Sequence, residues 1–259
     1  MLRNDLKFRG AVFRTCSAAF VLVLVSAGIP PVPPANAETN VAGRSVFLDP
    51  GHSGVNDSAI SRQVPNGRDG MKDCQTTGTS TNNGFPEHVF NWDVVLRIQD
   101  VLQGLGIHTG LSRSNDNELG PCVDQRAAEA NAAHPDAIVS IHADGGPPWG
   151  SGFHVNYSSP PLYPAQRGPA MQLAGTIRDF LSGAGFRKSD YVGNDGLYGR
   201  ADLAGLNFAE YPAVLVELGN MRNPGDAATM ETVEGRARYA QAVTNGIVAY
   251  LQQTTTEGS

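Results

Sequence analysis

The sequence lacks several features that would mark common classes of protein. It has no internal repeat, and charged residues make up only 17% of the chain with a net charge of −6. A basic excess typical of a surface for nucleic acid or anionic lipid is therefore missing. The apolar run at 18–25 is shorter than the roughly 20 residues that span a bilayer. We expect neither nucleic acid nor a membrane span in the mature protein.

The N-terminal segment has the pattern of a secretory signal peptide. Basic residues precede the short apolar run, and Ala35-Asn36-Ala37 supplies the small-x-small pattern of a cleavage site. An uncleaved transmembrane anchor is the alternative, but four prolines follow closely, within 30–34. We predict cleavage after residues 1–37, near Ala37, a short linker at 38–43, and a monomer exported to the periplasm or cell wall.

Cysteine is scarce, and its positions favour one disulfide bond. Of the three cysteines, Cys16 lies in the predicted signal, which leaves Cys74 and Cys122 as a pair in an oxidising compartment. Both lie in polar segments that contain Gly or Pro rather than in apolar ones. We predict that they are bonded to each other, with two free buried thiols as the alternative.

Apolar strand patterns alternate with helical ones along the rest of the chain. We expect strands at 45–48, 107–111, 137–141, 153–157, near 197 and at 213–216, and helices at 86–104, 123–133, 170–182 and 226–251. A polar stretch without a period is expected to form a long loop or irregular hairpin at 54–84. This order predicts a single α/β domain with a mostly parallel central sheet covered by helices, spanning 44–251 before a polar tail at 252–259.

Four residues in this pattern could carry chemistry. His52 and His142 each follow an expected strand, Glu87 lies in the first turn of a helix, and Glu217 ends an apolar strand. Such ends often gather at one rim of an α/β sheet. A catalytic zinc site needs three His or carboxylate ligands, one open position and a nearby base. The four residues form no local motif, so spacing alone leaves structural roles open.

Motifs along the chain resemble one known family. They occur in the order VFLDPGHSG, PEHVFNWDVVLRI, LSRSND, QRAAEAN, SIHAD, GFHVNYSS and YPAVLVELGNMRN, over about residues 44–250. Together they resemble the zinc-dependent N-acetylmuramoyl-L-alanine amidases of the type-3 class, as in mycobacterial or actinobacterial members without a wall-binding module. The resemblance implies a mixed sheet of about six strands flanked by helices.

The resemblance also assigns roles to the four candidate residues. It implies Zn²⁺ as the cofactor, held by His52, Glu87 and His142, with Glu217 in catalysis. Zinc would activate a water, and Glu217 would take the water's proton and pass it to the leaving amine. The implied substrate is peptidoglycan or a muropeptide, cut between N-acetylmuramic acid and L-alanine.

The chain departs from the family pattern at two places. Relatives commonly have Gly-Phe-Leu-Ser-Asn where this chain has LGNMRN at 218–223, and they have Asn where this chain has Asp144. These departures bear on substrate preference more than on the chemistry. The segment between Arg62 and Gly84 is also longer than the family minimum and could shape or cover the groove.

Further residues near the predicted ends are candidates for supporting roles. Asn91, Arg113 and Asp116 could orient the ligands, although loop hydrogen bonds and capping are the alternative. His88, next to Glu87, could compete with it as a ligand.

Two other functional classes compete with the amidase interpretation. The segment Gly51-His52-Ser53-Gly54 resembles the start of a serine-hydrolase elbow with Ser53 as nucleophile, but Val55 replaces the final glycine. A wall-binding protein on an inactive amidase fold is the other alternative, although all four chemical residues are present. A chelator should abolish zinc hydrolysis and leave a serine hydrolase untouched.

Overall fold

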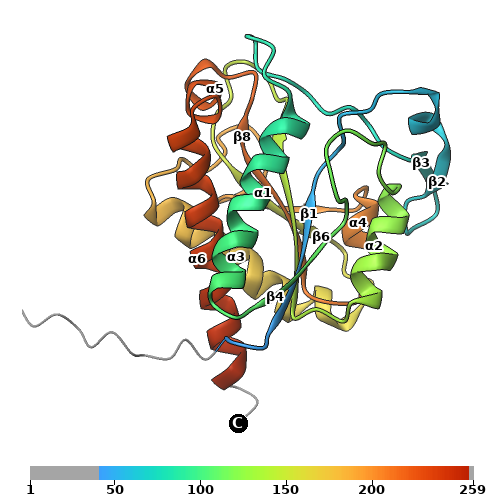
Figure 1. Ribbon diagram of the computed structural model, residues 1–259, viewed down its shortest axis with the longest axis vertical. Helices are drawn as coiled ribbons and strands as arrows, with labels where there is room; N and C mark the ends of the chain where they lie inside the picture. Colours follow the sequence, from blue (N-terminus) through green and yellow to red (C-terminus); the bar gives the residue numbers. More distant parts are fainter. Residues whose placement is uncertain (1–40, 257–259) are drawn as a thin grey trace, which may run out of the picture. The chain divides into compact units, whose positions relative to one another are not determined.

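A six-stranded sheet forms the centre of the protein in the computed structural model, which describes residues 41–256 (Figure 1). The predicted signal peptide and its cleavage site lie outside the described residues. The strands, in the order β4-β1-β5-β8-β6-β7, are β4 (His108–Leu111), β1 (Ser45–Pro50), β5 (Ala137–Asp144), β8 (Ala213–Asn220), β6 (His154–Ser158) and β7 (Leu197–Arg200). Neighbouring strands are parallel except β6 and β8, which are antiparallel. The prediction of an α/β domain with a mixed, mostly parallel sheet is confirmed.

The helices cover the two faces of this sheet unequally. One face packs against the longest helices, α1 (Glu87–Gly104), α3 (Gly168–Gly183) and α6 (Val233–Thr256). The other face packs against two shorter helices, α2 (Val123–Ala132) and α4 (Ala204–Asn207). Because side chains alternate along a strand, Val46 and Leu48 of β1 enter the first core while Phe47 enters the second. The second face is thus the more thinly covered one.

The prediction of one continuous C-terminal helix at 226–251 is wrong. The structure has two helices there, α5 (Pro224–Met230) and α6, and α6 continues to Thr256 through part of the expected polar tail. The break follows from capping: the hydroxyl of Thr232 accepts a hydrogen bond from Gly235 N at 3.0 Å and starts a new helix. Within the described residues, no helix is long and apolar enough to cross a membrane.

The polar stretch at 54–84 contains an irregular hairpin. The short 3-10 helix η1 (Ser58–Ser61) comes first, and β2 (Gln63–Pro65) and β3 (Met71–Asp73) then pair antiparallel. Elsewhere in the chain, a second 3-10 helix, η2 (Pro164–Gln166), precedes α3. Cys74 follows the hairpin and is bonded to Cys122, the residue before α2. Val123 N also donates to Cys74 O at 2.9 Å. The hairpin is therefore tied to the helix that covers the thin face of the sheet.

Candidate functional site

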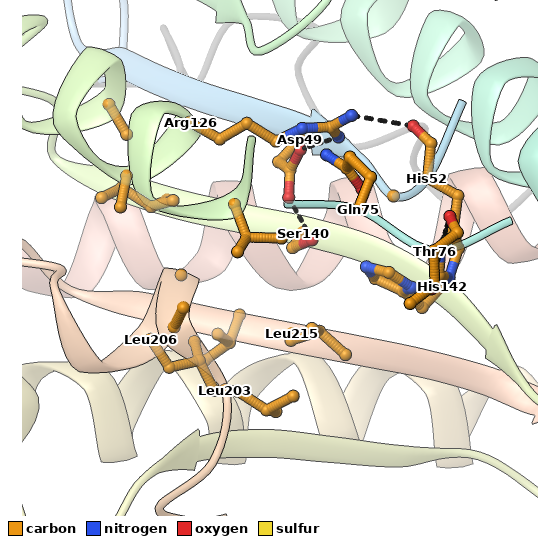
Figure 2. Close-up of a pocket in the computed structure, with 18 of the residues that line it drawn as sticks. Asp49, His52, Gln75, Thr76, Arg126, Ser140, His142, Leu203, Leu206 and Leu215 are labelled. Carbon is orange, nitrogen blue, oxygen red and sulfur yellow. Dashed lines mark hydrogen bonds and ion pairs between the residues drawn. The ribbon is translucent and has the colours of Figure 1, made fainter. Parts of the chain in front are cut away.

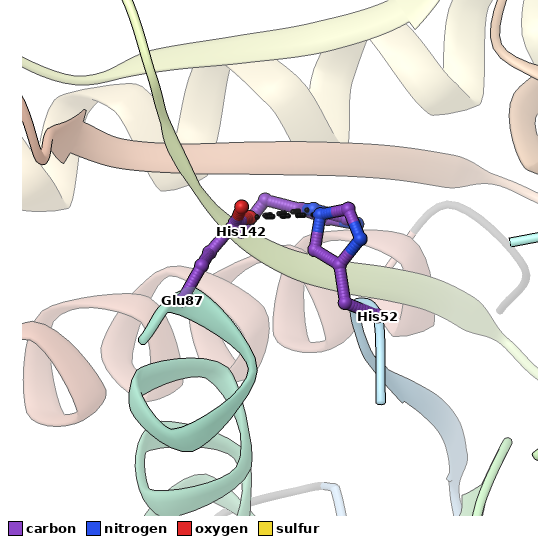
Figure 3. A group of neighbouring side chains, drawn as sticks. All are labelled: His52, Glu87 and His142. Atoms are coloured by element: carbon purple, nitrogen blue, oxygen red, sulfur yellow. Dashed lines mark hydrogen bonds and ion pairs between the residues drawn. The ribbon is translucent and has the colours of Figure 1, made fainter. Parts of the chain in front are cut away.

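Three side chains from distant parts of the chain meet at the C-terminal edge of the sheet. His52 follows β1, Glu87 is the first residue of α1, and His142 projects from β5 (Figure 3). Their ligand atoms all lie within 4.8 Å of one another, and they are the one such group of three found in residues 41–256. The structure thus brings together the three residues that were predicted as metal ligands.

The two strands at this edge are longer than expected. Strand β5 continues to Asp144 and β8 to Asn220, so His142 and Glu217 lie within strands rather than after them. The reason is that the pairing of β5 with β8 continues: His142 is the register partner of Glu217, and a register shift follows before Asp144. This pairing places Glu217 next to the cluster of ligands.

Glu87 is the centre of the cluster. Its Oε1 lies 3.1 Å from His52 Nε2 and 3.0 Å from His142 Nδ1. Two backbone amides hold the carboxylate, because Thr79 N donates to Oε2 at 2.9 Å and Ala143 N donates to Oε1 at 3.1 Å. The protein itself therefore supplies a buried carboxylate with fixed donors beside two imidazoles.

Two glycines make room for this cluster. A Cβ atom at Gly51 would stand 2.2 Å from ring atoms of His142. A Cβ atom at Gly78, where φ is +75°, would stand 2.6 Å from Glu87 Oε2 and 2.8 Å from the ring of His52. Larger residues at these two positions would displace the clustered side chains, a requirement that the sequence analysis missed although Gly51 is part of the motif DPGH.

His52 is held in an unusual backbone conformation by its neighbours. Its φ is 62°, in the left-handed region that few residues other than glycine adopt. Arg126 Nη2 donates to His52 O at 2.8 Å, and His52 Nδ1 donates to Thr76 O at 2.8 Å. The second bond leaves Nε2 of the neutral ring as the atom that faces the cluster.

Arg126 is anchored in turn by Asp49, a pair that sequence reasoning did not identify. Arg126 Nη1 donates to Asp49 Oδ1 at 2.8 Å, and the hydroxyl of Ser140 donates to Oδ2 at 2.6 Å. Although burial acts to raise the pKa of Asp49, Arg126 and the hydroxyl donors outweigh it and hold that pKa well below its usual range. The signal available in the sequence was an acidic residue within the strand that leads to His52.

The ionisation of the three clustered side chains follows from burial and from their mutual contacts. Burial lowers the pKa of His142, which favours the neutral ring that binds metals. At Glu87 burial opposes ionisation, but the charge of His52 and hydrogen bonds from both histidines lower its pKa well below the ordinary value. For His52, the attraction of Glu87 outweighs the effect of burial and raises the pKa. The protein therefore holds an ionised carboxylate between two imidazoles.

Glu217 differs from Glu87 in lacking hydrogen-bond donors to its buried carboxylate oxygen. Its Oε2 is buried and has no hydrogen-bond partner. Burial, and after it the negative charges of Glu87 and Asp144, raise the pKa of Glu217 well above its ordinary value. A carboxylate in this state holds and releases protons at higher pH than an exposed one, as proton transfer near neutral pH requires.

The three candidate supporting residues lie around the cluster. Asn91 is buried and donates to Gly51 O at 3.2 Å and to Glu87 Oε1 at 3.4 Å. Arg113 donates to Pro50 O at 2.9 Å and to Asp116 Oδ1 at 2.8 Å. These bonds fix the backbone of the two residues that precede His52.

His88, the suggested competitor for the ligand position, points elsewhere. Its Nδ1 lies 2.7 Å from Asp116 Oδ2, and it is not part of the cluster of ligand atoms. Ser53, the nucleophile of the alternative hydrolase, is 3% exposed. Among the described residues, no hydrogen bond joins its hydroxyl to a histidine. The pairing that would activate a serine nucleophile is therefore absent from this part of the chain.

A cavity opens beside the cluster on the thinly covered face of the sheet. Its volume is about 250 Å³, and Figure 2 shows Leu203, Leu206 and Leu215 on one side of it and His142 on another. Glu217 also lines this space. The wall near α2 carries the bonded pair of Arg126 and Asp49 (Figure 2). A bound molecule would therefore lie next to Glu217, His52 and His142, which all line this cavity.

Known proteins match nearly all of the described chain. A family model described as N-acetylmuramoyl-L-alanine amidase matches residues 46–249. The chain is 58% identical over 230 residues to the N-acetylmuramoyl-L-alanine amidase Rv3717 of Mycobacterium tuberculosis, a match that covers 88% of this chain and 95% of that protein.

Solved structures agree with this match. The N-acetylmuramyl-L-alanine amidase Ami1 of Mycobacterium smegmatis is 57% identical, with a TM-score of 0.82 over 83% of this chain and 99% of that one. Ami1 of Mycobacterium abscessus is 58% identical, with a TM-score of 0.80 over 82% of this chain and 100% of that one. The fold and the sequence therefore point to the same group of proteins.

Proposed function

The chain belongs to the N-acetylmuramoyl-L-alanine amidase family, and from this we infer that it hydrolyses the amide bond between N-acetylmuramic acid and L-alanine in bacterial peptidoglycan. It is therefore a cell-wall amidase. The observation that carries the finer proposal is the cluster of His52, Glu87 and His142 with Glu217 as the register neighbour of His142. We propose that this cluster holds zinc and that Glu217 moves the proton.

The three residues fit a catalytic zinc ion in type and spacing. Two imidazoles and one carboxylate form a three-ligand set that leaves a fourth position open. The separations of 3.0 and 3.1 Å between Glu87 Oε1 and the histidine nitrogens are close to the roughly 3.3 Å between neighbouring ligands of a tetrahedral zinc ion. When bound, zinc supplies Lewis-acid chemistry, since it polarises the amide carbonyl and lowers the pKa of water.

Glu217 is the residue that we assign to proton transfer. It is positioned by its pairing with His142, and its buried Oε2 has no partner that would compete for a proton. We propose that Glu217 takes a proton from the attacking water and delivers it to the nitrogen of L-alanine as the amide bond breaks. The cavity that Glu217 lines provides space for the substrate next to it.

The supporting residues and the boundaries of the mature enzyme are part of the same proposal. Asn91, Arg113 and Asp116 would keep the ligands oriented through the backbone and side-chain bonds described above.

We further propose export by a signal peptide at 1–37, with the catalytic domain at 44–251 acting on the wall or on soluble muropeptides. The substrate lies outside the cytoplasm, which supports this location.

The two competing functions are less well supported. A serine hydrolase would need Ser53 paired with a base, and the described part of the chain offers no such pair. An inactive wall-binding protein would have no need for a buried carboxylate without partners, which is costly to maintain. The retained chemistry therefore favours an active hydrolase.

Parallel digestion of two substrates tests the proposed function. Mature protein is incubated with muramyl dipeptide and with purified peptidoglycan, and the products are identified by mass spectrometry. We expect free N-acetylmuramic acid and intact peptide from the first, and peptide stems released from glycan in the second. Products cut within the glycan or within the peptide would contradict the assignment.

A further inference from the structure

His154 and Glu217 face each other across the one antiparallel pair of strands in the central sheet. They are register partners on β6 and β8, which places their Cβ atoms about 4.5–5.5 Å apart on the same face. His154 is 2% exposed. Its Nδ1 and the Oε2 of Glu217 are both buried, and neither has a hydrogen-bond partner. A potential donor and an acceptor are thus left unpaired at neighbouring positions.

The ring of His154 is confined by aromatic neighbours. It makes edge contacts with Tyr191 and Tyr198, whose ring centroids lie 6.1 and 6.0 Å away. Tyr191 is itself fixed, because its hydroxyl donates to Asp144 Oδ2 at 2.8 Å. These contacts restrict the imidazole to small rotations beside Glu217.

The charge state of the pair suits a hydrogen bond from the imidazole to the carboxylate. Burial, and after it the positive charge of Arg200, outweigh the attraction of Asp144 and lower the pKa of His154 to about 4. The ring is therefore neutral at neutral pH, with one N–H to donate. A buried carboxylate oxygen without a donor costs free energy that such a bond would recover.

We propose that His154 is a positioning residue for Glu217, with its Nδ1–H donating a hydrogen bond to Oε2 in the enzyme–substrate complex. The two atoms are not bonded in this structure, and the bond forms when the two side chains make small rotations toward each other. It leaves the other oxygen of Glu217 free to exchange the proton. This inference rests on the proposed function, because it assumes that Glu217 transfers the proton.

Two substitutions of His154 distinguish a role in positioning Glu217 from a role in packing against the neighbouring tyrosines. His154→Phe keeps an aromatic ring but removes the donor, whereas His154→Asn keeps an N–H close to the place of Nδ1 but gives up the ring. We expect kcat of His154→Phe to fall about tenfold to a hundredfold, with KM changed less than about threefold and zinc content unchanged. His154→Asn should recover most of kcat. His108→Phe, on an exposed position of β4, is the matched control and should behave as wild type.

The opposite order of activities, with kcat higher in His154→Phe than in His154→Asn, would overturn the proposal. If His154 serves only to pack against the tyrosines, His154→Phe keeps its kcat and His154→Asn loses stability and activity. Wild-type protein that cleaves no amide bond would instead remove the proposed function itself. The two failures are therefore distinguishable.

A measurement on the ring itself does not depend on turnover or on the folding of His154 variants. The ¹⁵N chemical shifts of the histidine rings are recorded for zinc-loaded protein saturated with the cleaved peptide. We expect Glu217→Gln to move the Nδ1 resonance of His154, while Glu210→Gln, at an exposed position, leaves it in place. An unchanged His154 resonance in Glu217→Gln would contradict the hydrogen bond.

Discussion

Gly51 lies so close to His142 that a Cβ atom at Gly51 would stand 2.2 Å from Cε1 and Nε2 of the imidazole ring. Gly51, in the first motif, therefore leaves room for the ring of His142, which comes about 90 residues later in the chain. The proposed metal site therefore depends on the lack of a side chain at Gly51 as well as on the three proposed ligands.

Gly51→Ala should weaken metal binding without unfolding the protein. The added methyl group forces the ring of His142 away from Glu87, so we expect zinc affinity to fall by about tenfold to a hundredfold, as for other changes that misorient ligands. Gly104→Ala is the matched control, since a Cβ there meets no atom within 4 Å. Zinc affinity would be measured by competition with a chelator, and equal affinities in the two variants would contradict the steric account.

Glu217→Gln should separate catalysis from metal binding. The amide keeps the size of the side chain but cannot accept the proton, so we expect kcat to fall about a hundredfold to ten-thousandfold with zinc content unchanged. His142→Ala, in contrast, removes a ligand and should lose both zinc and activity. Elemental analysis and turnover of muramyl dipeptide would be measured on the same samples. A Glu217→Gln enzyme with wild-type turnover would refute the assigned role.

The stability of the protein should depend on pH through His154. Its pKa is lowered from 6.5 to about 4 in the folded state, so the unfolded chain binds the proton more tightly between these values. The stability that His154 contributes is therefore present above pH 6.5 and is lost as pH falls toward 4, by about 3 kcal/mol at most.

Denaturant unfolding between pH 4 and 7 checks this dependence. His154→Phe should show a shallower loss of stability on acidification than wild type, because it has no buried ring to protonate. His108→Phe removes an exposed histidine and should follow the wild-type curve. Identical curves for wild type and His154→Phe would show that His154 is not the titrating group.

The disulfide bond should stabilise the hairpin side of the site. Cys74 and Cys122 are separated by 48 residues, and closing such a loop restricts the unfolded chain by about 4 kcal/mol in the loop-entropy model. We expect the double variant Cys74→Ser, Cys122→Ser to lose roughly 2–4 kcal/mol of unfolding free energy. If reduction leaves the unfolding midpoint of wild type unchanged, the bond does not contribute in this way.

Much of the fold could be predicted from the sequence because its strands and helices have clear apolar periods. The order of strands and helices and the mostly parallel sheet followed from alternating patterns, as at 137–141 and 213–216. The extensions of β5 and β8 could not be predicted, because they depend on pairing between His142 and Glu217 rather than on local pattern. The split of the last helix depended on one hydroxyl, that of Thr232, within a sequence of continuous helical character.

The sequence could predict the three residues of the cluster, but not most of the contacts that support them. These three residues stand in recognisable motifs, at or near the ends of apolar segments. The contacts of Arg126 with Asp49 and His52, and the space left by Gly78, arise only when distant segments are folded together. The proximity of His154 to Glu217 could not be predicted either, because the two residues belong to different strands.

The most direct test of the central claim follows the cleavage of muramyl dipeptide before and after removal of the metal. We predict that mature protein releases N-acetylmuramic acid, that chelation and dialysis abolish the release, and that about one equivalent of Zn²⁺ restores it. The metal-free protein should remain folded, because the sheet and its two cores do not include the cluster. Metal-free protein that cleaves the amide bond at the original rate would contradict the account.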